Sequence, residues 1–271
     1  MKTIYLDLDG TLLGKNSSLL HTGAGDRTNI AVDTLRKIEE TGNEVVVATG
    51  RTKEVTFEFC RSIGLTKYIG ELGSIIHTDD SDHYNFGDEA TRYMETNSLD
   101  PQGLFQHTEK AARLLIENFS GNLESHDPHN RNRFATFLLR GNVDLEKANH
   151  ILVENNFEIY ELIANGHGRF RVSMPNVENV IVYHLAPKGT TKATGIKRDQ
   201  EIRRLKKENC FMVGDGLADL QCYEYVNKVF VPSNGPLTDP DVETYARAHE
   251  NIILLDKSHN EGFAQAVDLI V

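Results

Sequence analysis

Two aspartates stand close together near the start of the chain, in the run Asp7-Leu8-Asp9-Gly10-Thr11. An apolar, β-prone block at residues 3–8 predicts a strand there. Alternate residues of a strand point to one side, so Asp7 and Asp9 should face one crevice at the strand ends, where α/β sheets bind ligands. Carboxylates this close favour a divalent cation such as Mg²⁺, or a shared proton. One could attack an electrophile while the other moves a proton, although Asp-Gly is also a common turn pair.

A second polar cluster, Val47-Ala48-Thr49-Gly50-Arg51, follows the Val-rich block at residues 44–48. Blocks of this kind are typical of buried strands in a parallel sheet. A threonine hydroxyl and an unencumbered glycine backbone can both hydrogen-bond a phosphate oxygen. The alternative is that Thr49 only caps a helix beside a glycine turn.

A lysine-containing segment, Pro187-Lys188-Gly189-Thr190-Thr191-Lys192, opens a predicted helix. Near the start of that helix, Lys188 or Lys192 could neutralise a phosphate or a carboxylate nucleophile. Each lysine could equally be an ordinary exposed side chain, and the residues alone do not choose between them.

A third aspartate motif, Gly214-Asp215-Gly216-Leu217-Ala218-Asp219, follows the β-prone block at residues 210–213. Asp215 should project from that strand end toward the same crevice and complete a carboxylate metal site. Asp219 lies at the start of the next predicted helix, where capping the helix dipole is the alternative role.

Strands and helices alternate in the two outer parts of the chain. Strands are predicted at residues 3–8, 44–48, 67–70, 210–213, 228–231 and 252–255, and helices at residues 29–40, 53–63, 194–205, 220–226 and from 262 onward. This rhythm favours an α/β fold in which helices cover a parallel sheet. An unusually long polar loop, residues 15–27, separates the first strand from the first helix.

The middle of the chain has a different pattern. Strands are predicted at residues 134–139, 158–163, 170–173 and 179–184, with helices at residues 105–119 and 145–154. Hairpin-connected strands with two helices predict an α+β unit with an antiparallel sheet. We therefore expect a discontinuous α/β core, residues 1–77 and 186–271, with an inserted α+β domain at residues 78–185.

Taken together, the order and strand context of these motifs resemble the haloacid dehalogenase-like phosphatase superfamily. Within it they are most similar to the Cof-like, subfamily IIB branch, which includes sucrose-phosphate and mannosyl-3-phosphoglycerate phosphatases. The resemblance covers roughly residues 1–77 and 186–271. It implies a Rossmann-like core with a parallel sheet, an inserted cap domain, Mg²⁺ as cofactor, and hydrolysis of a phosphate monoester through an aspartyl-phosphate.

The resemblance also implies a role for individual residues. Asp7 would be the nucleophile, Asp9 the general acid/base, and Lys192 rather than Lys188 the conserved-motif lysine, because it follows Gly189-Thr190-Thr191. The metal would be held by Asp7, the backbone carbonyl of Asp9, Asp215 and Asp219. The phosphate would be bound by Leu8, Thr11, Thr49, Gly50, Arg51 and Lys192. One departure is Ala218, where the branch usually carries an asparagine that supports the metal ligands.

Arginines are frequent in the predicted cap domain. They are Arg131, Arg133, Arg140, Arg169 and Arg171, accompanied by His129 and His167. Because arginine binds carboxylate and phosphate in a bidentate way, Arg131, Arg133, Arg169 and Arg171 are candidate substrate contacts. They would suit a small sugar phosphate or a glycosylated phosphoglycerate. The alternative is a solvated sheet face that binds nothing.

The composition of the chain excludes further classes of function and partner. The chain has 271 residues, 29 Lys+Arg against 40 Asp+Glu, and a formal net charge of −11, which argues against nucleic acid as the main partner. Three unpaired cysteines, no long apolar run and no signal-like start predict a cytoplasmic protein without a membrane partner. We expect a small phosphorylated substrate and a monomer or weak homodimer.

Four other functions compete with the hydrolysis of a phosphate monoester. A phosphotransferase or phosphomutase would pass the aspartyl-phosphate to a sugar, and a divergent binding protein on the same fold would be suggested only by Ala218. A dehalogenase is excluded, because that family carries a non-acidic residue at the position of Asp9. A dinucleotide-binding site is excluded because Gly23-Ala24-Gly25 lies in the polar loop and lacks the third glycine.

Overall fold

The computed structural model divides the chain into two units. Unit 1 comprises Met1–Asn85 and Thr191–Val271, and unit 2 comprises Phe86–Thr190. The structure describes residues 1–78, 80–167, 174–175 and 177–271. The predicted strand at residues 170–173 lies outside the described residues.

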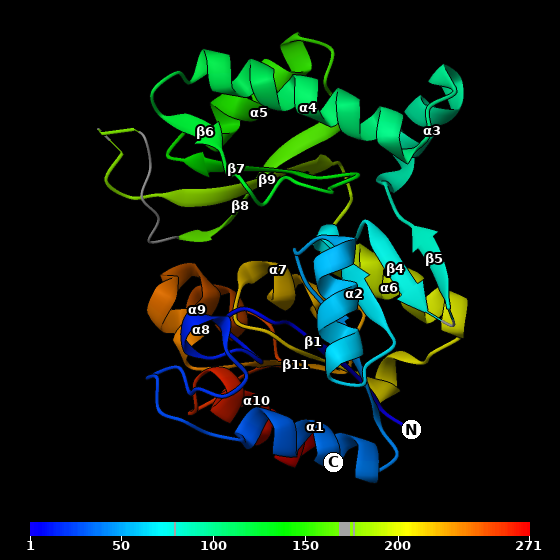
Figure 1. Ribbon diagram of the computed structural model, residues 1–271, viewed down its shortest axis with the longest axis vertical. Coiled ribbons are helices and arrows are strands. Elements are labelled where there is room, and N and C mark those ends of the chain that lie inside the picture. Colours follow the sequence, from blue (N-terminus) through cyan, green and yellow to red (C-terminus); the bar gives the residue numbers. More distant parts are fainter. Residues whose placement is uncertain (79, 168–173, 176) are drawn as a thin grey trace. The chain divides into compact units, whose positions relative to one another are not determined.

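Unit 1 is built on one eight-stranded sheet with the order β12-β11-β10-β1-β2-β3-β4-β5 (Figure 1). Its strands are β1 (Thr3–Leu6), β2 (Glu44–Ala48), β3 (Tyr68–Gly70), β4 (Ile75–Thr78), β5 (Ser81–Tyr84), β10 (Cys210–Val213), β11 (Lys228–Val231) and β12 (Ile252–Leu254). All pairs from β12 to β3 are parallel, and β4 and β5 add an antiparallel edge. Each parallel strand therefore begins at the same end of the sheet, and the chain crosses back to that end between strands.

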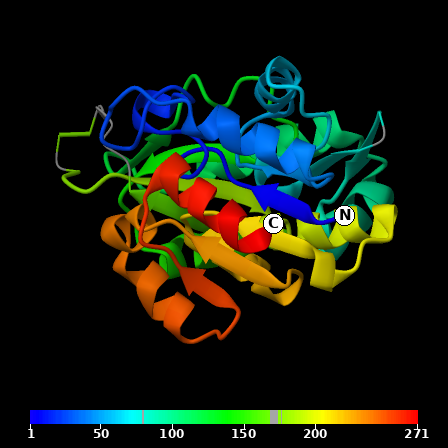
Figure 2. The same cartoon turned by 90° about the horizontal axis from the view of Figure 1, so that it is seen from below.

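Helices cover both faces of this sheet. They are α1 (Ile30–Glu40), α2 (Lys53–Ser62), α6 (Lys192–Arg203), α7 (Leu217–Leu220), α8 (Asn234–Thr238), α9 (Pro240–Arg247) and α10 (His259–Ile270). Short 3₁₀ turns lie at Lys15–Ser17, Glu71–Gly73, Lys207–Asn209 and Gln221–Glu224. Ile4 and Leu6 of β1 pack in the cluster that includes α1 and α10, whereas Tyr5 packs in the cluster on the α6 side. Figure 2 shows α1 and α10 side by side.

Unit 2 has an antiparallel sheet with the order β6-β7-β9-β8. Its strands are β6 (Leu123–Ser125), β7 (Phe137–Gly141), β8 (Tyr160–His167) and β9 (Ile181–Pro187), and its helices are α3 (Gly87–Asn97), α4 (Pro101–Asn118) and α5 (Leu145–Glu154). Helices α4 and α5 lie over one face of the sheet in Figure 1. Their apolar sides and that face form a separate hydrophobic core.

The chain leaves unit 1 after β5 and returns to it at α6. At residue 78, where the sequence placed the start of the inserted domain, β4 continues into β5, which pairs with it and extends the core sheet. The two crossing points are tied together inside unit 1, because the side-chain amide of Asn85 donates to Thr194 Oγ1 at 3.0 Å and to the Gly73 carbonyl at 3.1 Å.

Several predicted elements differ from the observed ones. The block at residues 220–226 is not one helix, because α7 ends at Leu220 and a 3₁₀ turn follows. Helices α3, α8 and α9 and strands β4, β5 and β6 were not predicted. Strand β5 has no apolar face. Helix α9 begins with Pro240, and Asp239 caps its first turn.

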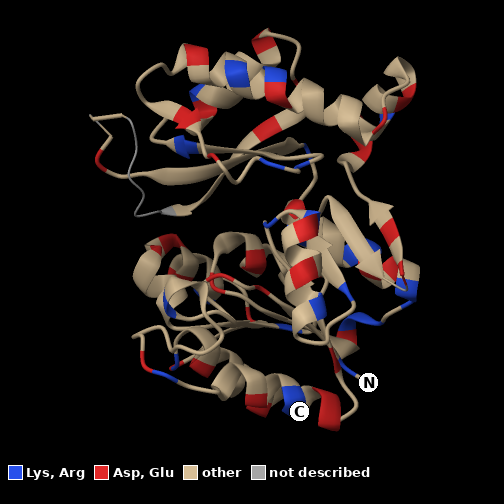
Figure 3. Cartoon of the chain, viewed as in Figure 1, with Lys and Arg blue, Asp and Glu red and all other residues tan. Residues whose placement is uncertain are grey.

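Acidic and basic residues are interspersed along the ribbon of both units in Figure 3. Acidic residues outnumber basic ones over the whole sequence, as the net charge of −11 requires. None of the helices in the described part of the chain combines the length and the apolar character that a membrane span needs.

Candidate active site

The predicted site residues follow three neighbouring strands of the core sheet. Asp7 comes directly after β1, Thr49 after β2, and Asp215 two residues after β10. β1 pairs in parallel with both β2 and β10, so the three strands end at the same edge of the sheet. That edge is where open α/β sheets place their ligands.

Strand β1 ends at Leu6, so Asp7 and Asp9 are not alternate residues of one strand as predicted. The chain turns instead: Leu12 N–H donates to the Asp7 carbonyl and Leu13 N–H to the Leu8 carbonyl. Gly10 has φ +84°, and a Cβ there would lie 2.2 Å from Asp215 Oδ2. Only glycine therefore allows this turn to pass so close to Asp215. The turn separates the Asp9 carboxylate from that of Asp7.

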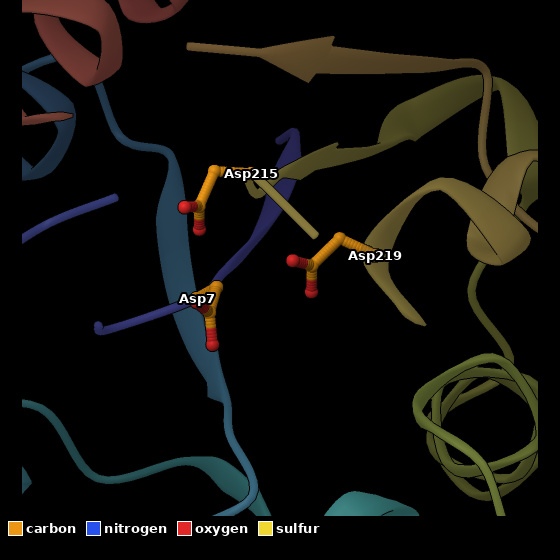
Figure 4. A group of neighbouring side chains, drawn as sticks. All are labelled: Asp7, Asp215 and Asp219. Carbon is orange, nitrogen blue, oxygen red and sulfur yellow. The ribbon is translucent and has the colours of Figure 1, made fainter. Parts of the chain in front are cut away.

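Three carboxylates converge at the strand ends, as Figure 4 shows. One oxygen from each of Asp7, Asp215 and Asp219 lies within 4.8 Å of the others. Lys192 Nζ donates to Asp7 Oδ1 at 2.6 Å and to Asp219 Oδ1 at 2.7 Å, and its side chain is only 7% exposed. A buried ammonium thus bridges two of the three carboxylates.

The pKa values of this cluster reflect burial and excess negative charge. Burial raises the pKa of Asp7 well above its usual range; Lys192 opposes the rise, and Asp219 and Asp215 add to it. Burial and the charge of Asp219 raise the pKa of Asp215 to about 7. Burial alone would lower the pKa of Lys192, but the carboxylates of Asp219 and Asp7 outweigh burial and raise it.

The cluster fits a hard divalent cation. Three carboxylates face one ammonium, so the group carries surplus negative charge when all three are ionised. Mg²⁺ prefers oxygen ligands and is usually held by a few carboxylates. Burial, and after it the neighbouring carboxylates, raise the pKa of Asp7 and of Asp215, so a bound cation would favour the ionised form of both groups.

Asp215 is fixed by two donors. Thr11 Oγ1 donates to Asp215 Oδ1 at 3.1 Å, and Asn234 Nδ2 donates to Asp215 Oδ2 at 3.0 Å. Asn234 also donates to the Gly10 carbonyl and accepts the backbone N–H of His259. The sequence analysis missed Asn234; its only signal was its place just beyond the predicted strand at residues 228–231.

Asp219 acts in two ways at once. Its Oδ2 accepts the backbone N–H of Gly216 at 3.0 Å and so caps the first turn of α7, which is the alternative role considered for it. Its Oδ1 accepts Lys192. Ala218, where an asparagine was expected, leaves both contacts of Asp219 in place.

The carboxylate of Asp9 lies outside the three-carboxylate cluster. Arg51 binds it with two donors, Nε to Oδ2 at 2.8 Å and Nη2 to Oδ1 at 2.6 Å, and Ser17 Oγ donates to Oδ1 at 2.9 Å. Burial would raise the pKa of Asp9, but the bonds from Arg51, together with that from Ser17, outweigh burial and lower it. The contact between Asp9 and Ser17 was not predicted.

The predicted phosphate-binding residues line the same edge. Thr49 is buried, and its Oγ1 accepts the backbone N–H of Arg51 at 3.3 Å. The side chain of Leu8 lies in the hydrophobic core, which leaves its backbone N–H as the group that could meet a phosphate. Lys188 belongs to unit 2, whereas Lys192 is the first residue of α6 in unit 1, where Thr191 caps the helix.

One of the four candidate arginines, Arg133, is engaged within unit 2, and so is the neighbouring Arg140. The buried Arg133 donates to the His129 carbonyl and to Thr136 Oγ1, and Arg140 forms an ion pair with Glu124. These bonds stabilise unit 2 and engage both guanidinium groups within it. Arg131 is exposed. Arg169 and Arg171 lie outside the described residues, as does the side chain of His167.

A family comparison agrees with this geometry. The chain matches the model of the haloacid dehalogenase-like hydrolases over residues 4–238, so it belongs to that family. The phosphoglycolate phosphatase of Methanosarcina acetivorans is 24% identical over 269 residues, which are 99% of this chain and 96% of that protein. The phosphoglycolate phosphatase of Nitrosopumilus maritimus is 22% identical over 224 residues, which are 82% of this chain and 79% of that protein.

Solved structures share the fold along the whole chain. The sucrose-phosphatase of Synechocystis sp. PCC6803 superposes with a TM-score of 0.68 at 14% identity, covering 99% of this chain and 97% of the other. A sugar phosphatase of HAD subclass IIB superposes with a TM-score of 0.63 at 15% identity, covering 100% of both chains. The predicted family and fold class are confirmed, and so is the prediction of an enzyme of the phosphatase class.

Proposed function

We propose that this protein hydrolyses the phosphate monoester of a small metabolite, with Asp7 as nucleophile, Asp9 as general acid/base and Mg²⁺ as cofactor. The observation that carries this proposal is the buried bridge from Lys192 to Asp7 and Asp219 beside Asp215. A buried charged cluster at a strand edge costs folding free energy, so its presence points to chemistry rather than to stability.

In the first step, Asp7 attacks phosphorus. Lys192 holds Asp7 Oδ1, so Oδ2 is the oxygen that we assign to the attack. A bond forms between Oδ2 and phosphorus while the bond from phosphorus to the ester oxygen breaks. Asp9 must first bind a proton, because its bonds from Arg51 and Ser17 favour the ionised form. It then gives that proton to the departing oxygen, because an alkoxide is a poor leaving group.

In the second step, Asp9 takes a proton from water. The water oxygen bonds to phosphorus, the Asp7–phosphorus bond breaks, and inorganic phosphate leaves with Asp7 restored. Thr49 and the backbone N–H groups of Leu8 and Gly50 would bind the phosphoryl oxygens. When bound to Asp7, Asp215, Asp219 and the Asp9 carbonyl, Mg²⁺ supplies positive charge against the phosphoryl group.

Relatives guide the choice of substrate. Two relatives named phosphoglycolate phosphatase support a small phosphorylated carboxylic acid, and structures named sucrose-phosphatase and sugar phosphatase support a sugar phosphate. We propose a substrate from these two classes and, in unit 2, Arg131 as the described arginine available to contact it. We expect the protein to need neither a nucleic acid nor a membrane as a partner for this activity.

Phosphate release from a panel of esters tests the proposal. The panel includes 2-phosphoglycolate, sugar phosphates and a phosphoglycerate, each with Mg²⁺ and with EDTA. Asp7→Asn should abolish Mg²⁺-dependent release, while Asp33→Asn, an exposed aspartate on α1, should leave it unchanged. Release that survives Asp7→Asn, or transfer of phosphate to a sugar instead of water, would contradict the proposal.

A further inference from the structure

The long polar loop after β1 is a folded structure. Within residues 14–28, five backbone hydrogen bonds of 2.8–3.0 Å close the loop on itself: Gly14 N to Ser18 O, Lys15 N to Thr22 O, Thr22 N to Asp26 O, Gly25 N to Thr22 O, and Thr28 N to Leu20 O. Isolated bridges join 14 with 18 and 21 with 27. The loop therefore has a fixed shape rather than that of a tolerated insertion.

The loop is also anchored from outside. Asn260, which is fully buried near the start of α10, donates its amide to the His21 carbonyl at 2.8 Å. Gly23 packs so tightly on the ring of His259 that a Cβ would lie 2.3 Å from His259 Nδ1. The far side of the loop is thus held by a helix from the other end of the chain.

The loop tip has an unfavourable backbone conformation. Asn16 and Ser17 have φ of +59° and +54°, and both are non-glycine residues in the left-handed region. Such conformations persist only where the surrounding structure determines them, and they concentrate at functional sites. One of these two strained residues, Ser17, is the one that contacts Asp9.

Ser17 meets one oxygen of the proposed general acid/base. Its Oγ donates to Asp9 Oδ1 at 2.9 Å, the oxygen that Arg51 Nη2 also contacts. The Asp9 side chain is 52% exposed, so packing alone does not fix its orientation. A hydroxyl both donates and accepts, whereas a guanidinium only donates.

We propose that Ser17 is a positioning residue for the reaction: the anchored loop holds its hydroxyl against Asp9 so that the carboxyl group is aimed at the departing ester oxygen. This inference rests on the proposed function. Ser17 itself makes and breaks no bond. The step in which its contribution depends on the substrate is the one in which the proton of Asp9 moves to the leaving group while the phosphorus–oxygen bond breaks, because the later attack of water is common to all esters.

Leaving-group dependence tests this role. 2-Phosphoglycolate releases an alkoxide that needs the proton, whereas 4-nitrophenyl phosphate releases a stable phenolate that does not. Ser17→Ala should lower kcat for 2-phosphoglycolate about ten-fold with little change in KM, and should leave kcat for 4-nitrophenyl phosphate within about two-fold. A purely structural role would reduce both rates equally.

Two further variants separate the hydroxyl from the backbone. Ser17→Gly also removes the hydroxyl but suits the positive φ, so it should show the same selective loss as Ser17→Ala. Ser18→Ala removes a neighbouring hydroxyl that bonds within the loop, and should leave the ratio of the two rates unchanged. Equal losses with both esters, or full activity of Ser17→Gly, would overturn the inference. Wild-type protein that releases phosphate from neither of these esters nor from any other ester of the panel would refute the proposed function and this inference with it.

Discussion

Replacing Lys192 with methionine removes a buried ammonium while keeping most of the side-chain volume. In the folded chain this ammonium bonds Asp7 and Asp219 at 2.6 and 2.7 Å, and the two carboxylate side chains are only 10% and 3% exposed. Losing one partner of a buried ion pair costs about 3–5 kcal/mol, because the remaining charge is left uncompensated. We therefore expect Lys192→Met to lower the free energy of unfolding by about 3–5 kcal/mol in EDTA at pH 8.

Urea unfolding followed by far-ultraviolet circular dichroism measures this loss, and the chain has no tryptophan to report it by fluorescence. Lys188→Met is the matched control, because Lys188 lies four residues away in unit 2 and forms no ion pair within the described residues. The double variant Lys192→Met/Asp219→Asn removes one uncompensated charge and should recover part of the stability.

The result that refutes this reasoning is specific. If Lys192→Met and Lys188→Met unfold within about 1 kcal/mol of each other, the ammonium does not compensate the buried carboxylates. If the double variant is less stable than Lys192→Met alone, the cost is a packing defect rather than a charge left without its partner.

Three other predictions follow from the same contacts. Gly10→Ala should lower stability by about 2 kcal/mol or more and abolish phosphate release, because the φ of +84° and a Cβ 2.2 Å from Asp215 Oδ2 both oppose a side chain; the urea midpoint and turnover report this. Mg²⁺ at about 100 times its Kd should raise Tm by about 5–10 °C, and Asp215→Asn should remove most of that shift in a thermal melt. Burial and the nearby charges of His129 and Arg140 lower the pKa of His126 to about 4, so the unfolded state binds a proton that the folded state does not between about pH 6.5 and pH 4. That stability is present above pH 6.5 and is lost as the pH falls toward 4, up to about 3 kcal/mol at 1.36 kcal/mol per unit; His126→Asn should show a smaller fall in urea midpoint between pH 7 and pH 5.

Local patterns predicted the buried elements best. Strands β2, β10 and β11 and helix α5 have the predicted bounds, because short Val-rich runs and a capped amphipathic repeat are set by nearby residues. Strand β5 was missed because its residues are polar and its register comes only from pairing with β4. The strand forms because β4 lies beside it, and the pattern of its own four residues does not reveal that pairing.

The site was predictable where each residue followed a strand end. Asp7, Asp215, Asp219 and Lys192 do come together, since parallel strands bring their carboxyl ends to one edge. The position of Asp9 was not predictable, because the turn at Gly10 replaces the expected strand geometry. Asn234 was missed for a different reason: it reaches Asp215 across 19 residues of chain, and no local spacing encodes that contact.

The hydrogen bond between Asn85 and Thr194 has an evolutionary consequence. It joins the two places where the chain passes between unit 1 and unit 2, so both ends of the inserted segment leave unit 1 at one point, which we call the stem. A stem of this kind lets lineages exchange, lengthen or reshape the insert by recombination without disturbing Asp7, Lys192 or Asp215. New substrate preferences can then arise in the inserted middle segment while the chemistry of the two flanking segments stays unaltered.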